Sequence, residues 1–266
     1  MTQPELMVYH DAEELAAAAA ERISRAAAES IAARDRFTLC LTGGSTPRRT
    51  YELLARQDGA SITRRALPDA KAKTGHAKSD LWSRTSLFFG DERFVPPDDD
   101  RSNYKMVRES LLQNAPIAED QVFAIPTHLA TPQQAAEEYA RTLKTFFGTG
   151  IAWPEFDLVL LGLGEDGHTA SLFPGAAALR VIDRWATFSP PGVLPPPVDR
   201  VTLTFPVFNA ARQVVFLVSG ASKAEACADV YKRRVSVEQR PAVEIRPVSG
   251  HPVWLVDRAA AAWRQL

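Results

Sequence analysis

Residues Phe156–Gly175 read FDLVLLGLGEDGHTASLFPG. The apolar run Leu158–Leu161 predicts a buried strand that ends in a glycine turn, and the ionisable residues Asp166 and His168 follow within the same segment. This order is typical of a site at the carboxyl end of a strand in a parallel α/β sheet. Because histidine is the side chain best suited to proton transfer near neutral pH, the segment predicts an enzyme with His168 at its centre.

The same segment permits two other interpretations when it is considered alone. Gly162, Gly164 and Gly167 have the G-x-G-x-x-G spacing of a dinucleotide-binding turn. That motif opens a helix in an early βαβ unit, whereas here the turn lies past mid-chain and leads into Leu172–Gly175, which is typical of a loop. The context therefore disfavours a nucleotide site. A structural turn whose acidic and histidine side chains are simply solvated is the plainer alternative.

Composition places limits on the class of protein. The 266 residues are 45% hydrophobic and 24% charged, which fits one large α/β domain or two small ones. The chain has no evident linker or internal repeat, so we expect a single domain over residues 1–266. The net charge of −1 provides no general attraction to nucleic acid or to membranes. No signal-peptide core or membrane-spanning apolar run is visible, so we expect a cytoplasmic protein with neither kind of partner.

The sequence does not predict a metal or a disulfide framework. Cys40 and Cys227 are too few for either a disulfide scaffold or a zinc site, and their apolar neighbours predict buried free thiols. The carboxylates near His168 and Asp91 could in principle bind an ion, but no histidine-rich ligand spacing supports one. We therefore expect neither a metal nor another cofactor.

Helix and strand signals alternate along the chain, which predicts a doubly wound, mainly parallel α/β sheet with helices on both faces. The predicted strands are Phe37–Leu41, Ser86–Phe89, Gln121–Ile125, Leu158–Leu161, Val201–Phe205, Val214–Val218 and Val253–Val256. The predicted helices are Asp11–Arg34, Thr46–Arg56, Asn103–Gln113, Pro132–Phe147, Ser222–Tyr231 and Arg258–Arg264. Segment 58–79 is basic and poor in large apolar residues, which predicts a flexible loop, and the proline-rich segment Ser189–Pro197 predicts an irregular connection.

A glycine-rich turn also follows the first predicted strand. Gly43, Gly44, Ser45 and Thr46 come directly after it and open a helix. Glycine lets the backbone approach a ligand closely, and the N–H groups at a helix start favour an anion, with the two hydroxyls as further donors. An ordinary strand-to-helix turn with Thr46 as the cap is compatible with the same residues.

Two further segments place cations after predicted strands. Asp91 and Arg93 follow Ser86–Phe89; the planar guanidinium suits a phosphate, and the carboxylate can accept hydroxyl groups of a ligand. Lys223 follows Val214–Val218 in the first turn of a predicted helix, where a lysine opposes the helix dipole and so indicates an anionic partner. A surface ion pair and a surface lysine are the plainer interpretations of each segment alone.

The four segments together are more specific than any one of them. In a parallel sheet they meet at the carboxyl edge, which then holds a helix-start anion site, Arg93, Lys223 and the acid–base candidate His168. This combination predicts a phosphorylated small molecule whose reacting end lies near His168.

Five stretches of the chain, in family order and covering nearly its whole length, resemble the glucosamine-6-phosphate isomerase/6-phosphogluconolactonase family, and within it the lactonases. They are LTGGSTPRRTYELLA (41–55), FFGDERFVPPDDDRSNYKM (88–106), FDLVLLGLGEDGHTASLFPG (156–175), RVTLTFPVFNAARQVVFLVSGASKAE (200–225) and RPVSGHPVWLVDRAAA (246–261). The resemblance implies the fold of the glucosamine-6-phosphate deaminases. It also implies metal-free hydrolysis of 6-phospho-D-glucono-1,5-lactone to 6-phosphogluconate in the oxidative pentose phosphate pathway.

On this interpretation neutral His168 takes a proton from the water that attacks the lactone carbonyl. Asp166 orients either the loop or the imidazole. We expect the phosphate to be held by Ser45, Thr46, Arg93 and Lys223. The groups that donate hydrogen bonds to the oxyanion are either backbone N–H groups near Gly43–Gly44 or the Arg93 side chain.

Two alternative functions can be separated by sequence features. The deaminases carry a glutamate five residues after the histidine, where this chain has Phe173, and an apolar ring cannot transfer a proton. They also typically carry a tyrosine where this chain has Arg93. A non-catalytic sugar-phosphate sensor usually carries a helix-turn-helix, whereas the residues before Phe37 predict only one long helix. We expect a monomer or a weak homo-oligomer.

Overall fold

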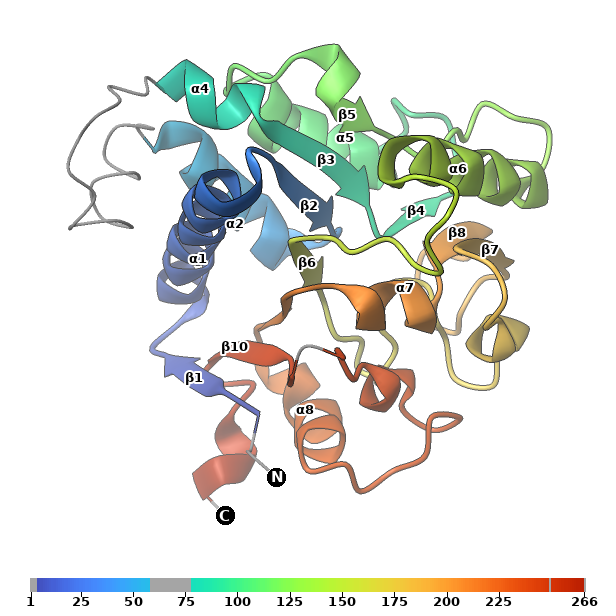
Figure 1. Cartoon of the computed structure of the whole chain (residues 1–266). Coiled ribbons are helices and arrows are strands. Elements are labelled where there is room, and N and C mark those ends of the chain that lie inside the picture. Colours follow the sequence, from blue (N-terminus) through green and yellow to red (C-terminus); the bar gives the residue numbers. More distant parts are fainter. Residues whose placement is uncertain (1–3, 58–77, 249, 266) are drawn as a thin grey trace.

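Seven strands form the main sheet of the protein: β1 (Leu6–Tyr9), β2 (Phe37–Leu41), β3 (Thr85–Phe89), β5 (Val122–Phe123), β6 (Leu158–Leu161), β9 (Val214–Val218) and β10 (Val253–Asp257) (Figure 1). The structure is a computed structural model that describes residues 4–57, 78–248 and 250–265. The strand order is β1-β10-β9-β6-β2-β3-β5, and each neighbouring pair is parallel. The predicted mainly parallel α/β sheet is therefore confirmed.

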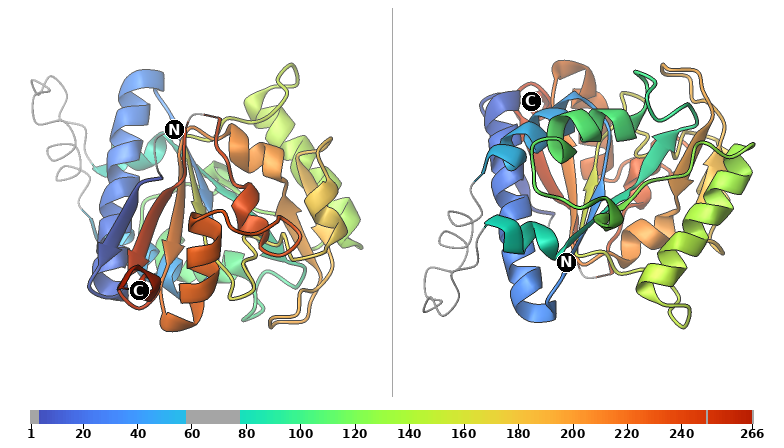
Figure 2. Two further views of the ribbon diagram at one scale, coloured as in Figure 1. Left: turned by 90° about the horizontal axis from the view of Figure 1, so that it is seen from below. Right: turned by 90° about the horizontal axis from the view of Figure 1, so that it is seen from above.

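Helices cover both faces of this sheet, as predicted. The α-helices are α1 (Ala12–Arg34), α2 (Ser45–Arg56), α4 (Lys78–Ser83), α5 (Asn103–Val107), α6 (Pro132–Phe147), α7 (Phe205–Ala210) and α8 (Ala224–Tyr231). Helices α1 and α2 pack together on one face, whereas α7 and α8 lie on the other (Figures 1 and 2). Because both faces are covered, every residue of β2, β6 and β9 is buried, which explains why β6 and β9 are wholly apolar and why Thr38 is the one polar residue of β2.

Several helical segments are shorter or tighter than predicted. The chain continues from α5 into a π-helix, Arg108–Leu112, so the single predicted helix Asn103–Gln113 is two elements. The 3₁₀ segments are Glu119–Gln121, Ala177–Arg180, Ala221–Lys223, Pro241–Glu244 and Ala262–Gln265. The predicted helix Ser222–Tyr231 thus begins within a 3₁₀ turn, and the predicted helix Arg258–Arg264 is wrong because only a short 3₁₀ turn forms there.

A second sheet, which the sequence did not predict, lies beside the first. It consists of β4 (Asp91–Arg93), β7 (Ala186–Ser189) and β8 (Arg200–Leu203), all antiparallel, in the order β4-β8-β7. The predicted strand Val201–Phe205 therefore belongs to this antiparallel sheet, and Phe205 instead begins α7. Gly90 joins the two sheets, because its N–H donates to Leu41 O at 2.9 Å and its carbonyl accepts the N–H of Leu203 at 2.8 Å.

Three smaller predictions have mixed outcomes. The predicted basic loop at 58–79 lies outside the described residues, apart from Lys78 and Ser79, which begin α4 instead. Both cysteines are buried and free, as predicted. None of the helices in the described part of the chain combines the length and apolarity needed to cross a membrane.

Candidate active site

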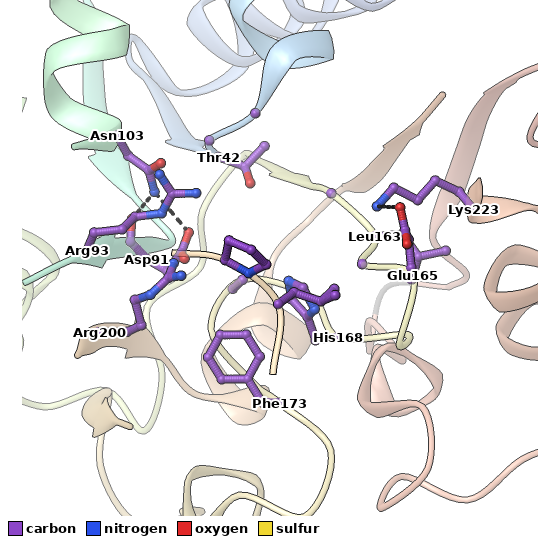
Figure 3. Close-up of a pocket in the computed structure, with 17 residues that line it drawn as sticks. Thr42, Asp91, Arg93, Asn103, Leu163, Glu165, His168, Phe173, Arg200 and Lys223 are labelled. Carbon is purple, nitrogen blue, oxygen red and sulfur yellow. Dashed lines mark hydrogen bonds and ion pairs between the residues drawn. The ribbon is translucent and has the colours of Figure 1, made fainter. Parts of the chain in front are cut away.

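A cavity of about 470 Å³ lies at the carboxyl edge of the main sheet, next to the second sheet (Figure 3). Six of the predicted site residues line it: Gly43, Gly44, Asp91, Arg93, His168 and Lys223. They come from the ends of β2, β6 and β9 and from β4, so the four segments singled out in the sequence meet at one site. The volume falls within the range of pockets that enclose small molecules.

The two predicted hydroxyl donors, Ser45 and Thr46, are not among the residues that line the cavity. Helix α2 begins at Ser45, which is exposed, and Gly44 is its N-cap with φ of 114°, a conformation that favours glycine. The expectation that Thr46 caps the helix is wrong, since no side chain caps this end. The first turn leaves the N–H groups of Ser45 and Thr46 without intrahelical acceptors, next to the lining residue Gly44.

His168 lines the cavity and forms a close pair with Asp166, which is not itself among the lining residues. Nδ1 of His168 lies 2.5 Å from Oδ1 of Asp166, and the same oxygen accepts the backbone N–H of His168 at 3.1 Å. Asp166 therefore contacts both the imidazole and the loop, the two options that the sequence left open. An ionised carboxylate here holds the ring proton on Nδ1, so that Nε2 carries the free lone pair.

The environment of Asp166 favours its ionised form. Burial opposes ionisation, but the hydrogen bonds from the side chain and backbone of His168 outweigh burial and hold the pKa of the carboxyl below its usual range. Gly164 permits this close arrangement. A Cβ at Gly164 would stand 2.1 Å from Nδ1 of His168 and 2.6 Å from Oδ1 of Asp166.

Asp91 and Arg93 stand on one side of the cavity together with Asn103 (Figure 3). Asp91 is 5% exposed and its Oδ2 accepts the hydroxyl of Ser171 at 2.6 Å. The amide of Asn103 donates to the backbone carbonyl of Asp91 at 3.0 Å. The Nη1 of Arg93 donates to the carbonyl of Arg101 at 2.6 Å, whereas its buried Nε has no hydrogen-bond partner in the described chain. Arg93 thus enters the site with part of its donor set uncommitted.

Arg200 adds a second guanidinium to the same side. Its Nε and Nη2 donate to the carbonyls of Val198 and Pro196 at 3.1 and 3.0 Å, which anchors the proline-rich connection beside the cavity. The guanidinium lies 5.7 Å from the ring centroid of Phe173, and that ring lies 4.8 Å from the imidazole of His168. Burial lowers the pKa of Arg200, but an arginine remains charged at neutral pH.

Lys223 lies on the opposite side of the cavity, with His168 between it and the arginines (Figure 3). Its Nζ is 3.7 Å from a carboxylate oxygen of Glu165. Lys223 ends the 3₁₀ turn before α8 rather than lying in the first turn of an α-helix, as the sequence suggested. The lining therefore carries three cations, Arg93, Arg200 and Lys223, against the two carboxylates of Asp91 and Glu165, and this excess of positive charge suits an anionic ligand. Among the described residues, no group of three or more histidine, cysteine, aspartate or glutamate side chains is arranged to hold a metal ion.

Thr42, Asn103 and Arg200 are among the lining residues that sequence reasoning missed. Thr42 directly precedes Gly43 and could have been included from its position alone. Asn103 lies in a stretch that carries the family resemblance, yet nothing in its local sequence indicates that its amide turns back to Asp91. Arg200 could not be found because it depends on an antiparallel sheet that was not predicted.

Comparisons with known proteins agree with this architecture. The model of the family described as glucosamine-6-phosphate isomerases/6-phosphogluconolactonase matches residues 10–254. A 6-phosphogluconolactonase from Synechocystis sp. is 41% identical over 233 residues, 87% of this chain and 86% of that relative. The solved 6-phosphogluconolactonase from Trypanosoma cruzi has a TM-score of 0.80 at 29% identity and covers 98% of this chain and 96% of its own.

The sheet and the cavity define an α/β protein whose candidate site, with its excess of cations, lies at the carboxyl edge of the strands. The chain belongs to the glucosamine-6-phosphate isomerase/6-phosphogluconolactonase family. A monomeric glucosamine-6-phosphate deaminase also shares the fold, with a TM-score of 0.74 at 21% identity over 97% of this chain and 99% of its own. That likeness concerns the fold alone, and it confirms the predicted relation to the deaminase fold.

Proposed function

We propose that this protein hydrolyses 6-phospho-D-glucono-1,5-lactone to 6-phospho-D-gluconate, the lactonase step of the oxidative pentose phosphate pathway, with His168 as the general base. The observation that carries the proposal is the pairing of His168 Nδ1 with Asp166 Oδ1 at 2.5 Å beside a cavity with three cations. The relatives named 6-phosphogluconolactonase support the choice of substrate.

The reaction begins with a water molecule that donates a hydrogen bond to Nε2 of His168. As the water oxygen attacks C1 of the lactone, Nε2 takes its proton, and ionised Asp166 stabilises the imidazolium through Nδ1. When the bond between C1 and the ring oxygen breaks, the imidazolium returns the proton to that oxygen. The products are a free hydroxyl at C5 and a carboxylic acid at C1, which ionises in water.

The two cationic sides of the cavity take different parts of the substrate. We assign the phosphate to Lys223 and to the N–H groups at the start of α2, those of Ser45 and Thr46, because a helix start and an ammonium both favour a dianion. The reacting carbonyl lies on the arginine side, since Phe173 contacts both His168 and Arg200. Arg93, which lines the cavity on this side, then stabilises the developing oxyanion.

Deaminase chemistry is not proposed, because the position that requires a proton-transferring carboxylate holds Phe173. This side chain is 4% exposed and its ring packs against the imidazole of His168 at 4.8 Å. A lactone needs no such group, because it is already an activated ring-closed ester.

The test is a lactone hydrolysis assay corrected for the spontaneous reaction. We expect the enzyme to accelerate the opening of 6-phosphogluconolactone and to release no ammonia from glucosamine 6-phosphate. Prompt ammonia release would indicate a deaminase. Tight sugar-phosphate binding with turnover at the spontaneous rate would indicate a sensor.

A further inference from the structure

Glu92 is a buried carboxylate that does not line the cavity. It lies in β4 between Asp91 and Arg93, and because successive side chains of a strand point to opposite faces, it turns away from the site while its two neighbours line it. Its exposed fraction is only 2%, so the fold buries a carboxylate at a position where an apolar side chain would cost less free energy to bury.

Four hydrogen bonds converge on this carboxylate. Oε1 accepts the backbone N–H groups of Arg93 and Asn103, both at 2.7 Å. Oε2 accepts the backbone N–H of Tyr104 at 2.7 Å and the hydroxyl of Ser102 at 3.1 Å. Three of these donors belong to the start of α5, so one side chain joins β4 to that helix.

The residues joined in this way carry side chains into the site. Arg93 and Asn103 both line the cavity, and each has its own backbone N–H bound to Oε1 of Glu92. The side chain of Asn103 also packs against Gly43, where a Cβ would stand only 2.0 Å from Oδ1 of Asn103. A shift of α5 relative to β4 would therefore move the arginine, the amide and the glycine turn with respect to one another.

We propose that Glu92 is a positioning residue of the active site, which ties β4 to the start of α5 and thereby sets where Arg93 and Asn103 stand relative to the reacting carbonyl. The inference rests on the proposed lactonase function, since it uses the role assigned to Arg93.

Burial and hydrogen bonding act in opposite directions on the charge state of Glu92. Burial raises the pKa of Glu92 to about 7, while its three backbone hydrogen bonds oppose that rise and nearby Asp91 adds to it. The charged side chains that interact with it are Asp91 on β4 and Arg200 on β8, and none of the four groups that donate hydrogen bonds to it carries a charge. An ionised carboxylate accepts all four bonds, whereas an amide at the same place offers one oxygen and turns its NH₂ group toward donors.

The first experiment compares Glu92→Gln with Asp157→Asn in steady-state lactone hydrolysis and in thermal unfolding. Asp157 is the control because it is also a buried carboxylate, at 5% exposure, and lies just before β6, at the end of that strand opposite the cavity. It accepts the N–H and hydroxyl of Thr38 at 2.8 and 2.9 Å and pairs with Arg34 at 2.8 Å. We expect Glu92→Gln to lower kcat roughly tenfold or more with a smaller change in KM, since misplacement by about 1 Å can cost up to a hundredfold. Asp157→Asn should retain wild-type kcat and KM at temperatures where it is folded.

The second experiment repeats Glu92→Gln in the Arg93→Ala and Asn103→Ala backgrounds. If Glu92 acts through these side chains, its effect on kcat must be smaller in each background than in the wild type, because part of what it positions is already missing. The same factor in all backgrounds would overturn the proposal. Kinetics of Glu92→Gln that match those of Asp157→Asn would also overturn it.

Two further measurements keep the test decisive. Should Glu92→Gln fail to fold, Ser102→Ala removes the 3.1 Å bond to Oε2 together with the cap that the Ser102 hydroxyl provides to the N–H of Lys105, both at the start of α5. It must lower kcat in the same direction by a smaller factor, and unchanged kinetics would contradict the proposal. Should the wild type show no lactone turnover, the proposed function falls. The positioning role is then judged by 6-phosphogluconate binding, which must weaken in Glu92→Gln and remain unchanged in Asp157→Asn.

Discussion

At the scale of single residues, the site depends on a few close contacts around His168. The carboxylate of Asp166 fixes one ring nitrogen, Phe173 packs against the ring, and Gly164 leaves the space in which the pair can approach. Cations stand on both sides of this group, with Lys223 on one side and Arg93 on the other (Figure 3). This division predicts that the two cations have separable kinetic effects.

Lys223→Ala and Arg93→Ala should differ in steady-state kinetics. Loss of Lys223 should raise KM roughly tenfold to a hundredfold with little change in kcat, because a charge-assisted contact to the phosphate is worth about 1.5–3 kcal/mol. Loss of Arg93 should lower kcat by about 10²–10³, the range for one oxyanion donor. An unchanged KM in Lys223→Ala would remove that lysine from the phosphate site.

Gly164→Ala should damage catalysis without unfolding the protein. The new methyl group would stand 2.1 Å from Nδ1 of His168, so the imidazole and the carboxylate must separate. We expect kcat to fall roughly tenfold to a hundredfold, as for other misplaced catalytic groups. Gly150→Ala is the matched control, because a Cβ there meets no atom within 4 Å. Equal kcat values in the two variants would mean that the His168–Asp166 pair does not limit turnover.

At the scale of elements, the site combines strands that the sequence predicts well with a sheet that it does not. Strands Phe37–Leu41, Leu158–Leu161 and Val214–Val218 form with the predicted bounds because both faces are covered and the runs are apolar apart from Thr38. Strand β4 is three charged residues, DER, which carry no such pattern, and its pairing with β8 joins residues far apart in sequence. Asp91 and Arg93 could be located because they directly follow a predicted strand. Arg200 was missed because only the pairing of β8 with β4 brings it to the site.

The link between β4 and α5 should show itself in the pH dependence of stability. Burial raises the pKa of Glu92 from 4.5 to about 7 in the folded state. The protonated form of Glu92 thus favours the fold, and this contribution is complete below about pH 4.5 and is lost as the pH rises through about 7. In thermal unfolding, the Tm of the wild type should fall relative to that of Glu92→Gln between pH 4.5 and 8. A constant difference in Tm would contradict a raised pKa.

At the scale of the whole molecule, the cavity takes residues from both sheets. The main sheet supplies the loop with His168 and the turn with Gly43, and the second sheet supplies Asp91, Arg93 and Arg200. The family to which the chain belongs includes both lactonases and deaminases, so the fold alone does not select the reaction. The selection is made by side chains within the cavity, and the base is the group on which the proposed hydrolysis depends most directly.

The most direct test of this account is the rate of 6-phosphogluconolactone hydrolysis by His168→Ala, corrected for the spontaneous reaction. We predict a fall in kcat of about 10²–10⁴, the range for loss of a general base, with an unchanged unfolding temperature and retained binding of 6-phosphogluconate. Both should be retained because the phosphate contacts proposed above lie on the Lys223 side of the cavity, and His168 stands on a glycine-rich loop. Full activity in folded His168→Ala would contradict the mechanism.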